Sequence, residues 1–92
     1  MEPKLFPIPK SGRVKIVCTG RDGFDIQCTG VDAADHKRLI GFFGSMQGRA
    51  GEFRFEYSDL VYPRCRFDSD SVPFITNGPD NHDVVFPVKI LH

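Results

Sequence analysis

Residues 39–70, LIGFFGSMQGRAGEFRFEYSDLVYPRCRFDSD, decide the fold because the spacing of their apolar residues changes partway along the stretch. The first part is apolar at intervals of three and four positions, which is the pattern of one helix face. GEFRFEY and RCRF then alternate apolar and polar residues, as half-buried strands do. The stretch therefore predicts a helix that leads through a glycine-rich joint into an aromatic hairpin.

The predicted helix spans about residues 33–47. Asp32 followed by Asp35 resembles a capping box with Asp in place of the usual Glu, and Gly48 is a natural C-terminal stop. The helix has an apolar stripe that should pack on a sheet: Leu39, Phe42, Phe43 and Met46. Its polar residues should lie away from that stripe: Asp35, Lys37, Arg38 and Gln47.

Two glycines lie inside this helix, Gly41 and Gly44. Each weakens a helix by about 1 kcal/mol relative to Ala. Two explanations stay open at this point: close packing of the helix against a sheet or another backbone, and a plain loss of stability.

The aromatic hairpin has a predicted register. Side chains alternate along a strand, so Phe53, Phe55 and Tyr57 share one face, while Arg54 and Glu56 share the other. In RCRF, Cys65 and Phe67 face the apolar side, and Arg64 and Arg66 point outward. We expect Phe55 opposite Phe67, which also places Glu56 opposite Arg66 and Arg54 opposite Asp68. The neighbouring register would place Arg54 opposite Arg66 and set like charges together.

Two further segments precede the helix. Residues 1–12 contain Pro3, Pro7 and Pro9 and are predicted to form an extended arm or an edge strand. Residues 13–19 and 24–28 alternate on either side of the turn signal GRDG, so they predict a hairpin with one buried face. Cys18 and Cys28 could then lie across this hairpin from each other.

The last strand is expected at residues 82–91, after the turn-rich run NGPDN. One face carries Val84, Phe86, Val88 and Ile90; the other carries Val85, Pro87, Lys89 and Leu91. Pro87 predicts an edge position or a bulge, because proline cannot donate to a sheet ladder. The second face is partly apolar, and both contact with another subunit and incomplete burial explain it.

Together these patterns predict an α+β, mainly β protein with a single domain over residues 1–92. Its architecture is expected to be an antiparallel β-sandwich or a partly open barrel with one helix packed on it. The predicted core consists of Leu39, Phe42, Phe43, Met46, Phe53, Phe55, Tyr57, Phe67, Val84, Phe86 and Val88.

The charge balance and the cysteines narrow the class of function. The chain has 12 Lys and Arg residues against 12 Asp and Glu, so no net field draws it to nucleic acid or to an anionic membrane. Its three cysteines form no C-x-x-C pair, and it has neither a signal peptide nor a long apolar run. We expect a soluble protein of a reducing cytoplasm with no membrane partner.

No catalytic or metal site is predicted. Cys18, Cys28, Cys65 and His82 lack the paired spacing of structural zinc ligands, so buried thiols are the favoured interpretation. Asp68-Ser69-Asp70 lacks the Gly and the distant Glu of a calcium loop. Nothing in the sequence gathers a histidine at a nucleophile, and no phosphate-binding glycine loop occurs. We expect no enzyme activity, no catalytic residue, no cofactor, no metal and no small-molecule substrate.

The aromatic stripe of GEFRFEY also has a functional interpretation, because RNA-binding sheets display aromatic side chains between basic ones. Glu52 and Glu56 interrupt the basic residues here, and the helix stripe needs an apolar partner. A nucleic-acid-binding or regulatory module is therefore the alternative, with nucleic acid disfavoured. The expected interaction surface consists of the outward side chains Arg54, Glu56, Arg64, Arg66, Val85 and Pro87.

The order of LIGFFGSMQGRAGEFRFEYSDLVYPRCRFDSD and the closing strand VVFPVKI resembles small minor tail proteins of long-tailed bacteriophages and prophages, the minor tail protein M group and related distal-tail components. The first hairpin, GRDGFDIQC, departs from the pattern of that family. The resemblance is strongest at Phe42, Phe43, Gly48, Arg49, Phe53, Phe55, Arg66, Phe67, Asp68 and Asp70.

The resemblance implies a non-enzymatic structural protein, a ring or adaptor subunit near the tip of a tail tube. The implied partners are other tail proteins and, in a homo-oligomeric ring, further copies of the chain. The implied location is the bacterial cytoplasm during assembly and then the tail of the virion.

Overall fold

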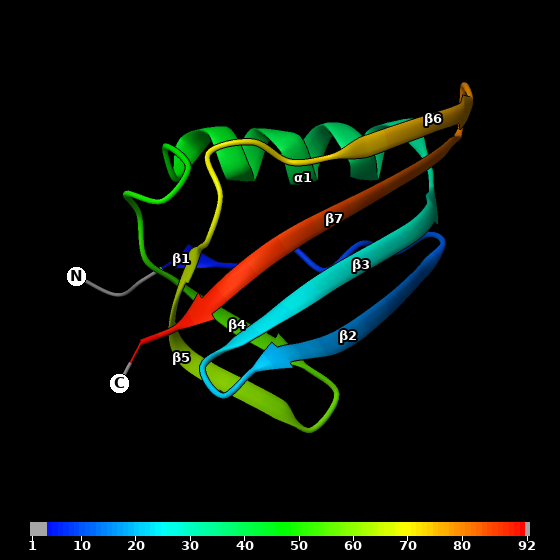
Figure 1. The fold of residues 1–92 in the computed structure, drawn as a ribbon. Coiled ribbons are helices and arrows are strands. Elements are labelled where there is room, and N and C mark those ends of the chain that lie inside the picture. Colours follow the sequence, from blue (N-terminus) through cyan, green and yellow to red (C-terminus); the bar gives the residue numbers. More distant parts are fainter. Residues whose placement is uncertain (1–3, 92) are drawn as a thin grey trace.

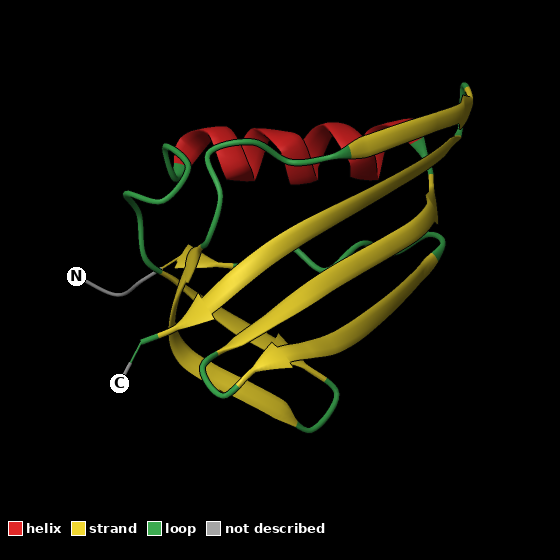
Figure 2. Ribbon diagram, viewed as in Figure 1, coloured by secondary structure: helices red, strands yellow, loops and turns green. Residues whose placement is uncertain are grey.

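The computed structural model describes residues 4–91 and contains one helix and seven strands (Figures 1 and 2). The elements in chain order are β1 (Lys4–Leu5), β2 (Arg13–Gly20), β3 (Gly23–Val31), α1 (Ala33–Ser45), β4 (Phe53–Tyr57), β5 (Leu60–Phe67), β6 (Phe74–Gly78) and β7 (Asn81–Ile90). This confirms the predicted α+β, mainly β class.

The seven strands form one sheet in the order β1-β4-β5-β7-β3-β2, and β6 pairs with β7 off this path. All neighbouring pairs are antiparallel except β1 and β4. The sheet curls, so that the Phe24 ring of β3 lies 5.3 Å from the Phe55 ring of β4, although these strands are not neighbours. The Tyr57 hydroxyl at the end of β4 donates to the Val14 carbonyl of β2 at 3.4 Å. The sheet is therefore a partly open barrel, and α1 packs on it (Figure 1).

The core is dominated by phenylalanine rings. Eight of the residues expected there are buried: Leu39, Met46, Phe53, Phe55, Phe67, Val84, Phe86 and Val88. Phe42, Phe43 and Tyr57 are half-buried and pack against them. The core also contains Phe6, Phe24, Ile26, Cys28, Val31 and Cys65.

Of the two alternatives for the N-terminal segment, an extended arm and an edge strand, the described residues form the edge strand. Lys4 and Leu5 form the edge strand β1, and the Phe6 N–H donates to the Arg54 carbonyl at 2.8 Å. Phe6 is 1% exposed, because its ring fills a space surrounded by phenylalanines from α1, β4, β5 and β7. The remaining three residues of the predicted arm, 1–3, lie outside the described residues.

The predicted register of the aromatic hairpin is wrong. Phe55 pairs with Tyr62 rather than Phe67, and Phe53 pairs with Cys65. The strands are joined by the two residues Ser58 and Asp59, and this short turn fixes the pairing at its end. A register shift between Phe53 and Phe55 then offsets the pairing of β4 with β5 by one residue farther from the turn.

The first hairpin has the predicted turn, and it decides the open question of whether Cys18 and Cys28 lie opposite each other. Cys18 lies opposite Phe24, and Cys28 lies opposite Val14. The two cysteines therefore face different partners across the hairpin.

Pro87 does not mark an edge strand, because β7 pairs with β3, β5 and β6. On one side of β7 the neighbour changes from β6 to β5 at this position. The Val85 N–H donates to the Pro73 carbonyl at 3.2 Å, and the Asp68 N–H donates to the Pro87 carbonyl at 2.8 Å. The missing N–H of proline therefore falls where the partner strand changes, which makes Pro87 tolerable in a central strand.

Asp35 was expected on the polar side of the helix, but it is 3% exposed. Its carboxylate accepts hydrogen bonds from the Lys10 N–H at 3.0 Å, the Ser11 N–H at 2.9 Å and the Ser11 hydroxyl at 2.6 Å. The Ser11 hydroxyl in turn accepts from the Asp32 N–H at 2.9 Å. Asp is shorter than Glu, and Ser11 bridges the distance that Glu spans in a capping box.

The helix ends two residues earlier than predicted, at Ser45. Gln47 and Gly48 follow with φ of 56° and 61°, and this left-handed backbone stops the helix. Nothing lies within 4 Å of a Cβ built on Gly41 or Gly44. Close packing therefore does not explain these two glycines, which leaves the plain loss of stability as the remaining alternative.

Candidate functional site

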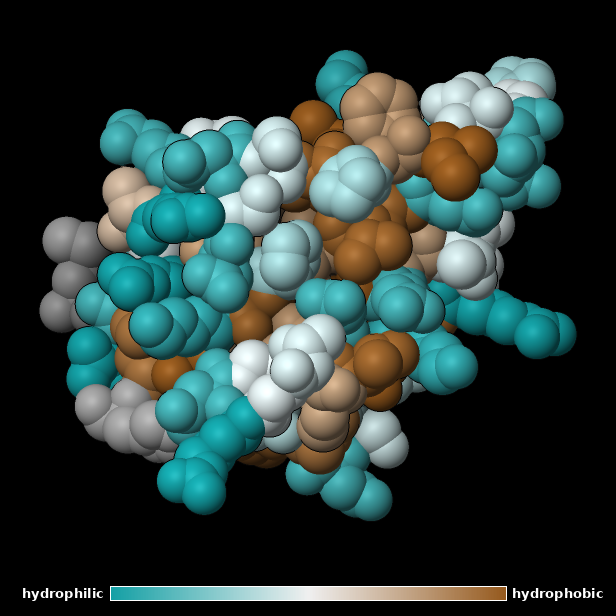
Figure 3. Space-filling view, viewed as in Figure 1, coloured by the Kyte–Doolittle hydropathy of each residue, from teal (hydrophilic) through white to brown (hydrophobic). Residues whose placement is uncertain are grey.

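Strand β6 is the most apolar free edge of the described sheet. It pairs only with β7, and its sequence FITNG carries no charged side chain. Phe74 and Ile75 are 57% and 62% exposed. Figure 3 shows apolar atoms on the part of the surface that β6 forms, at the upper right. An uncharged edge with exposed apolar side chains is a template for pairing with another strand.

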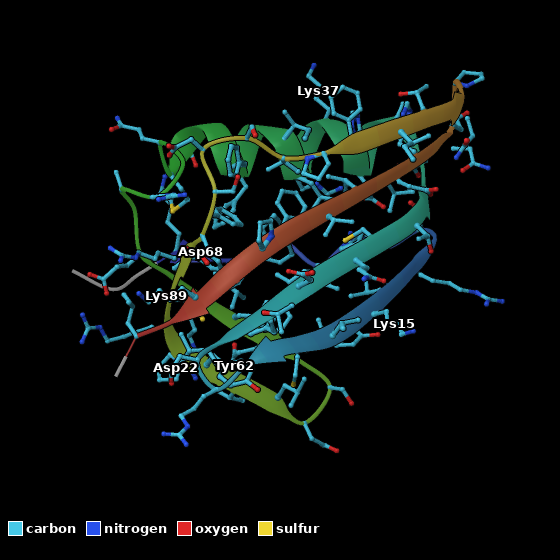
Figure 4. All side chains as sticks on the ribbon, in the orientation of Figure 1. Lys15, Asp22, Lys37, Tyr62, Asp68 and Lys89 are labelled. Atoms are coloured by element: carbon cyan, nitrogen blue, oxygen red, sulfur yellow. The ribbon has the colours of Figure 1, made fainter. Side chains whose placement is uncertain are left out.

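The other two ends of the sheet are protected against such pairing. Strand β2 carries the exposed cations Arg13 and Lys15, the latter labelled in Figure 4, and β1 has only two residues and begins with Lys4. Charged side chains, especially lysines, and short edge strands are the common means by which proteins prevent edge-to-edge association. Strand β6 contains no proline, because Pro73 precedes it and Pro79 follows it.

Three aromatic rings, which we call the histidine cluster, join β6 to the helix: His36 of α1, Phe74 of β6 and His82 of β7. The imidazoles of His36 and His82 stack with centroids 4.3 Å apart and an interplanar angle of 12°. The Phe74 ring lies 5.5 Å from His36. The cluster therefore links the start of the helix to both strands of the β6–β7 hairpin.

The ring nitrogens of His82 both have partners. Nε2 lies 3.2 Å from the Pro79 carbonyl, and Nδ1 lies 3.2 Å from the Thr76 hydroxyl. A carbonyl can only accept, so Nε2 carries a proton, and Nδ1 of the neutral ring accepts from Thr76. These contacts hold His82 within its own hairpin.

His36 has a different environment. Its Nε2 is buried without a hydrogen-bond partner among the residues that the structure describes. Burial, and secondarily the neighbouring His82, lowers the pKa of the His36 imidazole below its ordinary value. The neutral ring is thus the form that this contact favours.

Two carboxylates fasten the same hairpin to the junction between β3 and α1. Asp83 accepts from the Gly30 N–H at 2.8 Å, and Asp80 accepts from the Ala33 N–H at 3.3 Å. Ala33 is the first residue of the helix, where an acidic side chain is favourable. The hairpin is therefore attached to the rest of the fold by its tip as well as by the histidine cluster.

The residues expected to form an interaction surface lie on the outward side of three neighbouring strands, β4, β5 and β7. Arg54 forms an ion pair with Glu56 at 3.0 Å, and Arg64 forms one with Glu52 at 2.9 Å. These arginines are already paired with carboxylates of their own strands and loop. Arg66, Val85 and Pro87 point outward from β5 and β7, with Arg66 opposite Lys89.

The cysteines differ in exposure. Cys18 is exposed, while burial raises the pKa of Cys28 to about 12 and that of Cys65 to about 11. Within residues 4–91, no group of three or more His, Cys, Asp or Glu side chains is placed to hold a metal ion. The described helix is too short and too polar to cross a membrane.

Sequence reasoning missed the residues that matter most at this edge, Phe74, Ile75 and the stacked His36 and His82. An uncharged β-prone run between Pro73 and the turn NGPDN was the available signal for an exposed strand. No local sequence pattern indicates that His36 and His82 stack, because 46 positions separate the two histidines in the sequence.

The arrangement offers a strand edge for binding a protein backbone, with an ionisable contact behind it. No protein-family model, curated protein or solved structure matches this chain.

Proposed function

We propose that the chain is a non-enzymatic assembly subunit of a phage or prophage tail, a ring or adaptor subunit near the tail tip, that binds its neighbour through β6. The observation that carries this proposal is the uncharged, apolar and unpaired edge of β6, with Phe74 and Ile75 more than half exposed. The resemblance of residues 39–70 to minor tail proteins is the reason for placing the chain in a phage or prophage tail.

The occupant of the edge is a strand from a neighbouring copy of the same chain. Two considerations support this choice. The chain has a formal net charge of zero, so copies do not repel each other, and β6 itself brings no like charges to the contact. A strand added to a free edge satisfies main-chain N–H and C=O groups, and alternate side chains contribute apolar contact.

A substitution pair tests the contact. Ile75→Lys places a cation on the edge, whereas Val61→Lys makes the same kind of change on β5, where Val61 is 50% exposed. Sedimentation equilibrium over a range of concentrations at pH 7.5 measures the association. We expect the wild type and Val61→Lys to self-associate, and Ile75→Lys to associate at least about tenfold more weakly because charge on an edge opposes pairing.

Two results would contradict self-association through β6. One is a wild-type protein that stays monomeric at every concentration, and the other is an equal loss of association in both variants. The proposal that the chain belongs to a tail is tested separately by its genomic position. We expect the neighbouring genes to encode tape-measure and tail-tip proteins.

The alternative, a nucleic-acid-binding or regulatory module with an aromatic β-surface, lacks a comparable observation. Phe53 and Phe55 are 0% exposed and therefore offer no face for stacking bases. Arg54 and Arg64 beside them are paired with carboxylates. The edge of β6 is the stronger basis for a function.

A further inference from the structure

The histidine cluster is the described contact that joins β6 to the helix through side-chain rings. His36 lies between Phe74 and His82, at 5.5 and 4.3 Å from their ring centroids. Phe74 begins the short ladder of β6, which pairs with β7 at four positions and is irregular between Thr76 and Gly78. A strand with so short and irregular a ladder depends on such additional contacts.

We propose that protonation of His36 releases β6 from α1, so that the binding edge is presented at neutral pH and lost at mildly acidic pH. The consequence for binding rests on the proposed function of β6. The release of the hairpin does not, since it concerns contacts within one chain.

The two imidazoles differ in the hydrogen-bond partners of their nitrogens. A protonated His82 keeps partners for both N–H groups, because the Pro79 carbonyl and the Thr76 hydroxyl can both accept. A protonated His36 would carry a buried Nε2–H with no acceptor, and its charge would lie against the second imidazole. Protonation therefore favours the conformation in which His36 has left the cluster and reached water.

The pKa of His36 gives the direction of the effect. Because the folded pKa is lowered, the released state binds the proton more readily than the packed state. The packed state is thus fully favoured above the ordinary histidine pKa of about 6.5 and loses this advantage as the pH falls through the lower, folded value.

The other ionisable groups around the cluster do not replace this effect. Asp80 and Asp83 bind main-chain N–H groups of Ala33 and Gly30, and Asp35 binds Ser11 and Arg38. Asp32 caps the helix, and Lys37 points into solvent from α1 (Figure 4). Within residues 4–91, neither imidazole forms an ion pair with any of these carboxylates.

Amide hydrogen exchange tests the release, with rates expressed as protection factors so that the intrinsic pH dependence of exchange is removed. In the wild type, we expect protection of the β6 amides to fall below pH 6.5 by up to about tenfold per pH unit, the limit for one proton. His36→Phe keeps a ring in the stack but removes the titrating group, so its β6 protection should stay constant from pH 7.5 to 5. The amides of Ile16 and Ile26, paired across β2 and β3, serve as the internal control.

Three results would overturn the proposal: unchanged β6 protection in the wild type, the same fall in His36→Phe, or an equal fall at Ile16 and Ile26. If His36→Phe folds poorly, an NMR titration of the wild-type imidazoles replaces it. The loss of β6 protection must then follow the titration of His36, and a mismatch refutes the mechanism. The exchange experiment measures only the protection of the β6–β7 hairpin within one chain. A negative result therefore does not affect the association test of β6, and a negative association test does not affect the exchange result.

Discussion

Replacing Phe6 tests whether the N-terminal segment is part of the core. The Phe6 ring is 1% exposed, and its centroid lies between 5.6 and 6.4 Å from the rings of five other phenylalanines, which are Phe42, Phe53, Phe55, Phe67 and Phe86. Phe6→Ala removes the ring that these five rings surround.

The expected cost follows from burial and from the space left behind. Burying a phenylalanine side chain contributes about 1.5 to 3 kcal/mol by transfer alone. The unfilled space raises the loss for Phe→Ala in a core to about 3 to 5 kcal/mol. A domain of this size has a free energy of unfolding of about 5 to 15 kcal/mol, so the variant should lose a large share of its stability.

Equilibrium unfolding in urea, followed by circular dichroism, measures this loss. Leu5→Ala is the matched control, because Leu5 is adjacent in the sequence but 54% exposed, and we expect it to change the free energy of unfolding by less than about 1 kcal/mol. A loss below about 1 kcal/mol in Phe6→Ala, or equal losses in both variants, would refute the placement of Phe6 in the core.

Two further predictions concern the helix. Gly41→Ala and Gly44→Ala should each raise the free energy of unfolding by about 0.5 to 1 kcal/mol, since a Cβ at either position meets nothing within 4 Å. Gly12→Ala is the contrasting variant and should be destabilising, because its φ is +70° and the new Cβ would lie 2.2 Å from the Thr29 carbonyl oxygen; thermal unfolding separates the two outcomes, and a stabilising Gly12→Ala would count against them. Asp35→Asn should cost about 1.5 to 3 kcal/mol near pH 7. The hydrogen bond from the Ser11 hydroxyl, more than any other favourable contact, lowers the pKa of Asp35. The stability that the ionised carboxylate gives the wild type should therefore be lost as the pH falls below the unfolded pKa of about 3.9 and through the folded pKa. Urea unfolding from pH 7 to 2.5 checks it, and equal acid sensitivity of the wild type and Asp35→Asn would contradict it.

Local patterns in the sequence determined the elements of this protein. The change from helical spacing to alternation at residues 39–70 correctly predicted α1 followed by β4 and β5. Alternation likewise predicted which side chains of β3 and β7 face inward, because side-chain direction in a strand depends only on position along the chain. The cap at Asp32 was visible for the same reason, since it involves residues three apart.

The tertiary structure alone decided how these elements meet. Ser11 completes the helix cap from 21 positions away, and Phe6 enters the core beside rings that come from four elements. Pro87 occupies a central strand because the neighbour of β7 changes beside it, which no property of the residues around Pro87 reveals. The β6 edge and the stacked His36 and His82 likewise depend on which strands become neighbours when the whole chain packs. That choice is driven by the burial of apolar surface over the entire sheet rather than within any one segment.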